Sequence, residues 1–185
     1  IEGQFPKFSN CAVTLGKFDG IHRGHRKLIQ KILEHKKEYG TTSVVVAFVS
    51  DRQTILTGEE RRLLLEDMGV DVLLECPLNE QIRHMKADQF IRQILIGSLQ
   101  ASFVVVGEDY RFGYERKGTP DLLKKAGLKY GYESEIVPKE MDGSRKISST
   151  FIREELKKGN MHKISELLGT DFFVAGEVEH GKGLG

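Results

Sequence analysis

The sequence has few of the features that mark secreted, membrane or disulfide-stabilised proteins. Its 185 residues contain no tryptophan and two cysteines, Cys11 and Cys76, so a disulfide framework is excluded. The longest uninterrupted apolar run, residues 44–49, is far shorter than the roughly 18 residues that cross a bilayer, and no secretory signal is visible. Both cysteines lie in or beside apolar, strand-like runs. We therefore expect buried, reduced thiols, a cytoplasmic protein and no membrane partner.

The sequence also has no large excess of charge of either sign. The chain has 28 basic and 27 acidic side chains, with a formal net charge of +1. This balance produces no global field that would attract nucleic acid, so any binding of anions must be local. The predicted partners are therefore small molecules and not nucleic acid, and the oligomeric state is left open. The length suits one full domain with a small appendage.

Residues 11–29, CAVTLGKFDGIHRGHRKLI, carry the first signal of function. Residues 12–15 are rich in strand formers, three glycines then mark a turn, and the apolar spacing of residues 28, 29, 32 and 33 fits one face of a helix. A strand that enters a helix through such a turn leaves unpaired backbone N–H groups at the helix start. The helix dipole favours negative charge there, so the turn is a predicted anion site.

Two histidines lie in this turn. His22 and His25 form the pattern H-x-G-H, in which Gly24 lets the backbone approach a bound group and the two imidazoles can point the same way. Taken alone, such a pair is more often a surface feature or an occasional metal pair than a catalytic device. The remaining histidines and the two cysteines are scattered and suggest no third zinc ligand.

Strands alternate with helices along the chain. The predicted strands are residues 12–15, 43–49, 72–76, 103–106 and 134–137, and the predicted helices are 27–39, 59–68, 87–96, 122–130 and two within 147–169. This order predicts an α/β fold with a doubly wound parallel sheet, whose ligands bind at the carboxyl ends of the strands. The turns after the first and fourth strands are therefore the expected places for chemistry.

A second candidate site is the start of the predicted helix near residue 149. In I-S-S-T-F-I-R, residues 147–153, Ser149 and Thr150 could bind phosphate together with free N–H groups, and Arg153 one turn later adds a charged fork. The alternative is an ordinary helix cap with an exposed arginine.

A third candidate follows the fourth strand, in V-V-V-G-E-D-Y-R-F-G, residues 104–113. Asp109 and Arg111 offer polar contacts, and Tyr110 and Phe112 offer flat apolar surface for an aromatic ring. The alternative is that these aromatic residues are part of the core and close the sheet.

These motifs carry a family resemblance. H-x-G-H after a strand, preceded by G-x-F-D, resembles the nucleotidylyl transferase superfamily. With I-S-S-T-x-I-R about 125 residues later, and with the V-G-x-[DN]-F-x-F-G-like third motif, the chain resembles prokaryotic FAD synthetases, the adenylyltransferase half of bifunctional riboflavin kinase/FMN adenylyltransferases. The resemblance implies a Rossmann-like domain over residues 1–169. Residues 170–185, with an alternating strand from Phe172, resemble the start of a riboflavin kinase-like β-barrel, and no kinase activity is expected from this chain.

The resemblance also implies a reaction and a set of roles. AMP would pass from ATP to FMN, giving FAD and pyrophosphate, and Mg²⁺ would arrive with ATP and not in a protein cage. Asp19 is expected to cap nearby backbone N–H groups more than to take part in chemistry. The implied catalytic residues are His22, His25 and Arg153; those for ATP are Gly16, Phe18, Asp19, Gly24, Ser149 and Thr150; those for the flavin are Asp109, Arg111 and Phe112.

The chain departs from the family pattern in two places. Residues 47–54, AFVSDRQT, stand where the family usually carries a Pro-His-Pro segment, and Lys17 stands where many members have a small or amide residue. The first departure affects the flavin side of the site. Two alternatives therefore stay open: adenylyl transfer to another phosphorylated acceptor such as phosphopantetheine, and a non-catalytic nucleotide- or flavin-binding module.

Overall fold

A computed structural model describes residues 6–49 and 54–176. Its centre is a parallel sheet in the order β3-β2-β1-β4-β5, as predicted for a doubly wound fold. The strands are β1 (Cys11–Gly16), β2 (Thr42–Val49), β3 (Val72–Pro77), β4 (Ala101–Gly107) and β5 (Glu133–Val137). The helices are α1 (Arg23–Tyr39), α2 (Gly58–Asp67), α3 (Glu80–His84), α4 (Ala87–Phe90), η1 (Ile91–Ser98), η2 (Tyr114–Arg116), α5 (Pro120–Tyr130), α6 (Ser149–Lys158) and α7 (Met161–Leu168).

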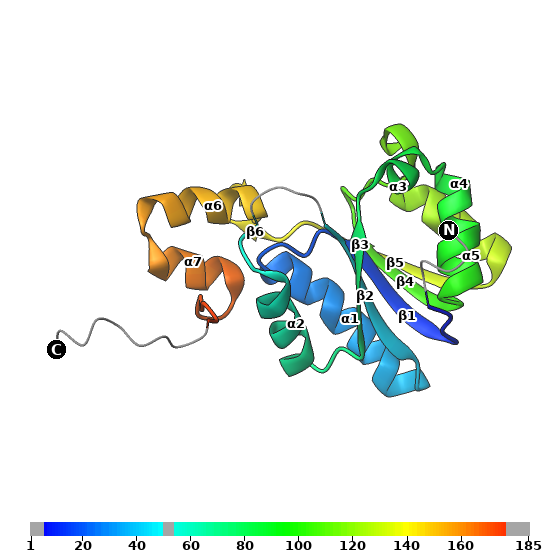
Figure 1. Cartoon of the computed structure of the whole chain (residues 1–185), viewed down its shortest axis with the longest axis horizontal. Coiled ribbons are helices and arrows are strands. Elements are labelled where there is room, and N and C mark those ends of the chain that lie inside the picture. The colour runs from blue at the N-terminus through cyan, green and yellow to red at the C-terminus, as the bar shows by residue number, and fades with distance from the viewer. Residues whose placement is uncertain (1–5, 50–53, 177–185) are drawn as a thin grey trace.

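The sheet is buried on both faces because helices cover each of them. Figure 1 shows α1 and α2 on one side of the sheet and α4 and α5 on the other. Neighbouring residues of β2 accordingly belong to opposite cores: Val44 and Val46 pack with α4, η1 and α5, whereas Val45 and Ala47 pack with α1 and α2. This double burial explains why the strands are nearly continuous apolar runs in the sequence.

The strand order also fixes where a ligand can enter. From β1 the chain moves outward through β2 to β3, and it then returns to place β4 on the other side of β1. The carboxyl ends of β1 and β4 therefore lie side by side where the winding reverses, which is the ligand-binding crevice of this class of fold.

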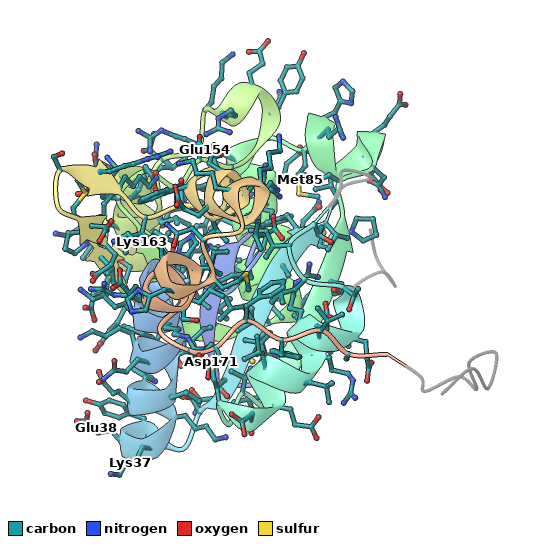
Figure 2. All side chains as sticks on the ribbon, turned by 90° about the vertical axis from the view of Figure 1, so that its left-hand side faces the viewer. Lys37, Glu38, Met85, Glu154, Lys163 and Asp171 are labelled. Atoms are coloured by element: carbon teal, nitrogen blue, oxygen red, sulfur yellow. The ribbon has the colours of Figure 1, made fainter. Side chains whose placement is uncertain are left out.

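A helical pair is attached beside this crevice. Helices α6 and α7 share a small core of their own with Ile147, and the short hairpin of β6 (Met141–Asp142) and β7 (Arg145–Lys146) runs into them. Figure 2 shows Lys163 of α7 on the side of this hairpin, where its Nζ pairs with Asp142 at 2.8 Å. Arg26 of α1 donates to the carbonyl of Leu168 at 2.8 Å. These contacts fix the start of α6 over the end of the sheet.

Several local predictions differ from the structure. The first helix begins at Arg23 and not at Lys27, so His25 lies in its first turn, and the last part of the helix predicted over 87–96 is the π-helix η1. Neither α3, η2 nor the β6–β7 hairpin was predicted. Residues 171–176 form no strand, and the rest of the strand predicted from Phe172 lies outside the described residues.

Both cysteines are buried free thiols. Within the described ranges, no helix is long and apolar enough to span a bilayer.

Gly127 offers a test of packing against helix propensity. It lies in α5, and a Cβ added there would lie 2.5 Å from the carbonyl oxygen of Tyr132. Helix propensity alone favours alanine by about 1 kcal/mol. We expect Gly127→Ala to lower the free energy of unfolding by about 1–3 kcal/mol instead, because the clash is with backbone. Denaturant unfolding measures this. Leu128→Ala, at a neighbouring exposed position, should change stability by less than about 0.5 kcal/mol, and a more stable Gly127→Ala would contradict the packing argument.

Candidate active site

A cavity of about 1140 Å³ opens at the carboxyl ends of β1 and β4. Its walls come from the turn after β1, the turn after β4, residues 137–140 and the segment that enters α6. The three motifs recognised in the sequence therefore share one cleft. Of the predicted site residues, the cavity is lined by Gly16, Asp19, His22, Gly24, His25, Asp109, Arg111, Phe112, Ser149, Thr150 and Arg153. Phe18 is fully buried behind the turn and is not part of this lining.

Asp19 joins the first turn to its surroundings. Its Oδ1 accepts the backbone N–H of Ile55 at 2.6 Å, and its carboxylate also pairs with Arg153 of α6. The carbonyl of Asp19 accepts the hydroxyl of Ser149 at 2.8 Å, although 130 residues separate the two in the chain. The capping role expected for Asp19 thus serves a distant loop, and the same residue holds the starts of α1 and α6 together.

The two histidines form a stacked pair at the start of α1. The Nδ1 atom of His22, the N-cap residue, accepts the backbone N–H of His25 at 3.3 Å. The ring centroids are 3.8 Å apart and the planes differ by 16°. Because Nδ1 of His22 is an acceptor, its ring proton is on Nε2. The Nδ1 atom of His25 is buried and has no hydrogen-bond partner among the described residues.

Both imidazoles are neutral at pH 7. Burial, together with a smaller contribution from the nearby charge of Lys146, lowers the pKa of His22 to about 4. Burial lowers the pKa of His25 well below its ordinary value as well, with smaller contributions from His22 and Lys146. These rings can therefore donate N–H hydrogen bonds to a bound anion but do not add positive charge.

The start of α6 carries both the cap and the exposed donors. Ser148 is the N-cap residue, since its hydroxyl accepts the N–H of Phe151 at 3.3 Å. Ser149 and Thr150 then lie in the first turn and line the cavity. The predicted helix cap is therefore present, and the same turn faces the cleft; phosphate binding by this motif stays a prediction. In this structure Ser149 and Arg153 also bind Asp19.

The turn after β4 combines a charged pair with aromatic rings. Asp109 pairs with Lys146 of β7, and Arg111 donates to the carbonyl of Tyr110 at 2.7 Å. The ring of Phe112 is buried, with its centroid 5.7 Å from that of Tyr110 and 5.4 Å from that of Phe90. The aromatic residues are thus part of the core and of the cavity wall at once. The Tyr110 hydroxyl is buried without a partner in the described part of the chain.

The cavity is electropositive although the chain is nearly neutral. Nine cationic and five acidic residues line it, whereas the whole chain has a formal charge of +1. The cations are Lys17, Arg61, Arg83, Arg111, Arg116, Lys139, Lys146, Arg153 and Lys157. Low-dielectric walls with one prevailing sign of charge concentrate ligands of the opposite sign. This excess of cations is compatible with the local anion site expected from the sequence, which stays a prediction.

Several charged residues of the cavity were missed in the sequence, and Lys146 and Arg61 are the two with the most informative contacts. Lys146 directly precedes the I-S-S-T motif, but the two-residue strand that aims it at Asp109 has no periodic signature. Arg61 lies in an ordinary charged helix and is buried by tertiary contacts. Among residues 6–49 and 54–176, no three histidine, cysteine or acidic side chains gather as a metal cage would require.

The lowered pKa of His22 predicts a loss of stability in acid. Between pH 6.5 and about 4 the unfolded chain binds a proton at His22 that the folded chain does not. The free energy of unfolding therefore falls as the pH drops through this window, by up to about 3 kcal/mol from this group. Urea unfolding at several pH values should show a shallower decline for His22→Gln. His162→Gln, at a strongly exposed histidine, should keep the wild-type slope; equal slopes for all three proteins would contradict the assignment.

Curated relatives match the chain over nearly its whole length. Bifunctional riboflavin kinase/FMN adenylyltransferases from Buchnera aphidicola (of Acyrthosiphon pisum), Escherichia coli K12 and Pseudomonas fluorescens are 35%, 33% and 35% identical to it. The alignments cover 96%, 95% and 97% of this chain, and 60%, 59% and 60% of the respective relatives. The chain thus spans about three fifths of the length of these relatives.

Solved structures and a family model agree with these relatives. A Streptococcus pneumoniae crystal structure described as a macrolide-efflux protein superposes with a TM-score of 0.80 at 31% identity, covering 90% of this chain and 67% of that one. Thermotoga maritima TmcAL bound with α-thio ATP, at 16% identity and a TM-score of 0.54 over 86% of this chain and 53% of that one, shares the fold. The model of the FAD synthetase family matches residues 5–151, and the chain belongs to that family.

Proposed function

We propose that this chain is an FMN adenylyltransferase, which transfers AMP from ATP to FMN and releases FAD and pyrophosphate. The observation that carries the proposal is the convergence of the turn after β1, the turn after β4 and the start of α6 on one electropositive cavity. The names of the curated relatives support the same reaction. The cavity is also large enough for two nucleotide-sized ligands to share, since small-molecule sites are typically about 300–1,000 Å³.

The nucleotide would bind between the two helix starts. Backbone N–H groups at the beginnings of α1 and α6 favour phosphate oxygens. The N–H groups of His22 and His25 would hold the α-phosphate and stabilise the charge that develops there. Ser149, Thr150 and Arg153 would contact the β- and γ-phosphates from the other side, and Gly16, Gly24 and Asp19 would shape the turn. Phe18 would contribute by supporting His25 from behind, since its ring centroid lies 4.9 Å from that of His25.

The reaction needs no protein nucleophile. A phosphate oxygen of FMN attacks the α-phosphorus of ATP, the bond from that phosphorus to the oxygen bridging to the β-phosphate breaks, and pyrophosphate leaves. Catalysis then consists of positioning and charge stabilisation. Lys146 would neutralise charge on the same phosphates. Mg²⁺ would accompany ATP as its counter-ion, because it usually keeps phosphate and water ligands and the described residues do not form a cage for it.

The flavin would lie toward the turn after β4. Phe112 presents an aromatic ring in the cavity wall, and Asp109 and Arg111 lie beside it as polar groups. Flat rings pack well against aromatic side chains, which favours a flavin over a flexible acceptor such as phosphopantetheine. Residues 47–54 stand where the family usually carries Pro-His-Pro, and residues 50–53 of this segment lie outside the described residues.

The proposed domain organisation, location and partners follow from the same function. We infer an adenylyltransferase domain over residues 1–169 and the start of a riboflavin kinase-like β-barrel over 170–185. Two buried free thiols support a reducing, cytoplasmic location. The substrates are small molecules, and no nucleic acid partner or membrane partner is proposed.

Acceptor choice is the direct test of the reaction. With ATP, Mg²⁺ and FMN the protein should form FAD and an equal amount of pyrophosphate, separated by chromatography and measured by a coupled phosphate assay. Phosphopantetheine in place of FMN should give no adenylylated product, because it has no flat ring for Phe112 and Tyr110 to contact. Transfer to phosphopantetheine would reassign the acceptor. Binding of ATP or flavin without release of pyrophosphate would identify a non-catalytic module.

His25 tests the assignment of the catalytic donors. His25→Ala should lower turnover by about 10²- to 10³-fold, the scale of losing one preorganised donor, while ATP affinity measured by calorimetry falls much less. Such a split marks an interaction made mainly in the transition state. His162→Ala, at an exposed histidine of α7, is the matched control and should leave both values unchanged. Equal losses of affinity and turnover in His25→Ala would mean that this residue only binds substrate.

A further inference from the structure

Arg61 is a buried cation to which the proposed mechanism gives no role. It lies in the first half of α2, and only 2% of the residue is exposed. Its Nε donates to the carbonyl of Phe18 at 3.3 Å, across 43 residues of sequence, and its Nη1 pairs with Glu75 of β3. One guanidinium thus connects α2, the end of β3 and the turn after β1.

The turn after β1 needs contacts from other elements to keep its conformation. Phe18 and Ile21 have φ angles of 47° and 41°, in the left-handed region that residues with side chains rarely occupy. Such conformations are costly and persist only where the surroundings over-determine them. Asp19 supplies one restraint through Ile55 and α6. The Arg61 bond to the Phe18 carbonyl supplies another, and it satisfies a backbone acceptor that has little access to water.

The Phe18 side chain extends the effect of the Arg61 bond to the two stacked histidines. The ring of Phe18 is fully buried, and its centroid is 4.9 Å from that of His25. His25 in turn stacks on His22. A shift in the Phe18 backbone would therefore move the surface against which His25 rests.

Packing alone does not account for an arginine at this position. Removing a guanidinium from water is expensive, and an apolar side chain of similar volume would often be at least as stabilising. The neighbouring Arg62 shows the ordinary alternative: it is exposed and pairs with Glu59 and Glu66 on its own helix. Arg61 instead points inward, where its planar fork can serve a carbonyl and a carboxylate together.

We propose that Arg61 is a positioning residue: by donating to the Phe18 carbonyl it holds the turn after β1 in the conformation that sets His25 against the nucleotide. The inference rests on the proposed function for its effect on catalysis. Its structural part, the control of His25 by Arg61, does not require turnover.

Three variants separate positioning from stability. Arg61→Met removes the donor and leaves Glu75 without its partner. The double variant Arg61→Met/Glu75→Gln removes the donor and the charge imbalance together. Arg61→Lys keeps a cation for Glu75 but loses the planar fork. Arg62→Met is the matched control, since it removes a neighbouring exposed arginine.

We expect turnover to fall on the order of 10²-fold in all three Arg61 variants, the scale of a misplacement of about 1 Å at a reacting group. The KM for ATP should change much less. The ¹⁵N–¹H signals of the His25 imidazole, assigned by their loss in His25→Ala, should shift in the ligand-free Arg61 variants and remain in place in Arg62→Met. The double variant should recover thermal stability relative to Arg61→Met but not turnover.

Recovery of turnover together with stability in the double variant would overturn the proposal and leave Arg61 a purely structural ion. Unchanged His25 signals in the Arg61 variants would overturn it as well. If Arg61→Met does not fold, Arg61→Lys and the double variant decide in the same way. If the wild-type protein makes no FAD, the proposed function fails, but the His25 signals still test the positioning role.

Discussion

The site depends on the bonds that Asp19 makes to two distant parts of the chain. Its carboxylate accepts the N–H of Ile55 and pairs with Arg153, and its carbonyl accepts the hydroxyl of Ser149. Without them the starts of α1 and α6 would be two separate helix ends. Each alone would be a weak anion site, because the effect of a helix dipole fades within one turn. Two helix starts that are held together can bind several phosphates of one nucleotide. Such a pair is a more specific anion site than a single helix start.

The fold was largely predictable because its signals are local and repeated. Buried parallel strands appear in the sequence as continuous apolar runs, and the inward face of α1 appears as Leu28, Ile29 and Ile32. The doubly wound parallel sheet and the position of the crevice followed from general rules of α/β topology, whereas the order of the strands was not predicted. The misses are short or irregular elements. A two-residue strand such as β7 has too few residues for a period, and the π-helical η1 breaks the spacing on which helix prediction relies.

Cavity-lining residues were predictable where they belong to a contiguous sequence motif. They were not predictable where only tertiary contacts bring them to the cavity. His22 and His25, or Ser149 and Thr150, are visible because the motif is contiguous. Lys146 and Arg61 act from other elements, and nothing in the surrounding residues distinguishes them from surface cations. Burial also decides the charge of the histidine pair, which the sequence does not show: the low pKa of both rings keeps them neutral. The positive charge of the site therefore comes from the lysines and arginines around them.

Two of those cations already have carboxylate partners, and this bears on the proposed binding of a nucleotide. Arg153 pairs with Asp19, and Lys146 pairs with Asp109. Both side chains of the Lys146–Asp109 pair are open to water, at 41% and 47% exposed, and such a pair contributes little net stability. In the Arg153–Asp19 pair the arginine side chain is 40% exposed and the carboxylate 8%. In the proposed binding mode a triphosphate would take over the Lys146 donor at small cost, and it would exchange with Asp19 for Arg153. Asp19 is not left unsatisfied by such an exchange, because it keeps the N–H of Ile55, and its carbonyl keeps Ser149. If the proposed function holds, these neutral bonds would keep the two helix starts in place while the charged groups pair with the nucleotide.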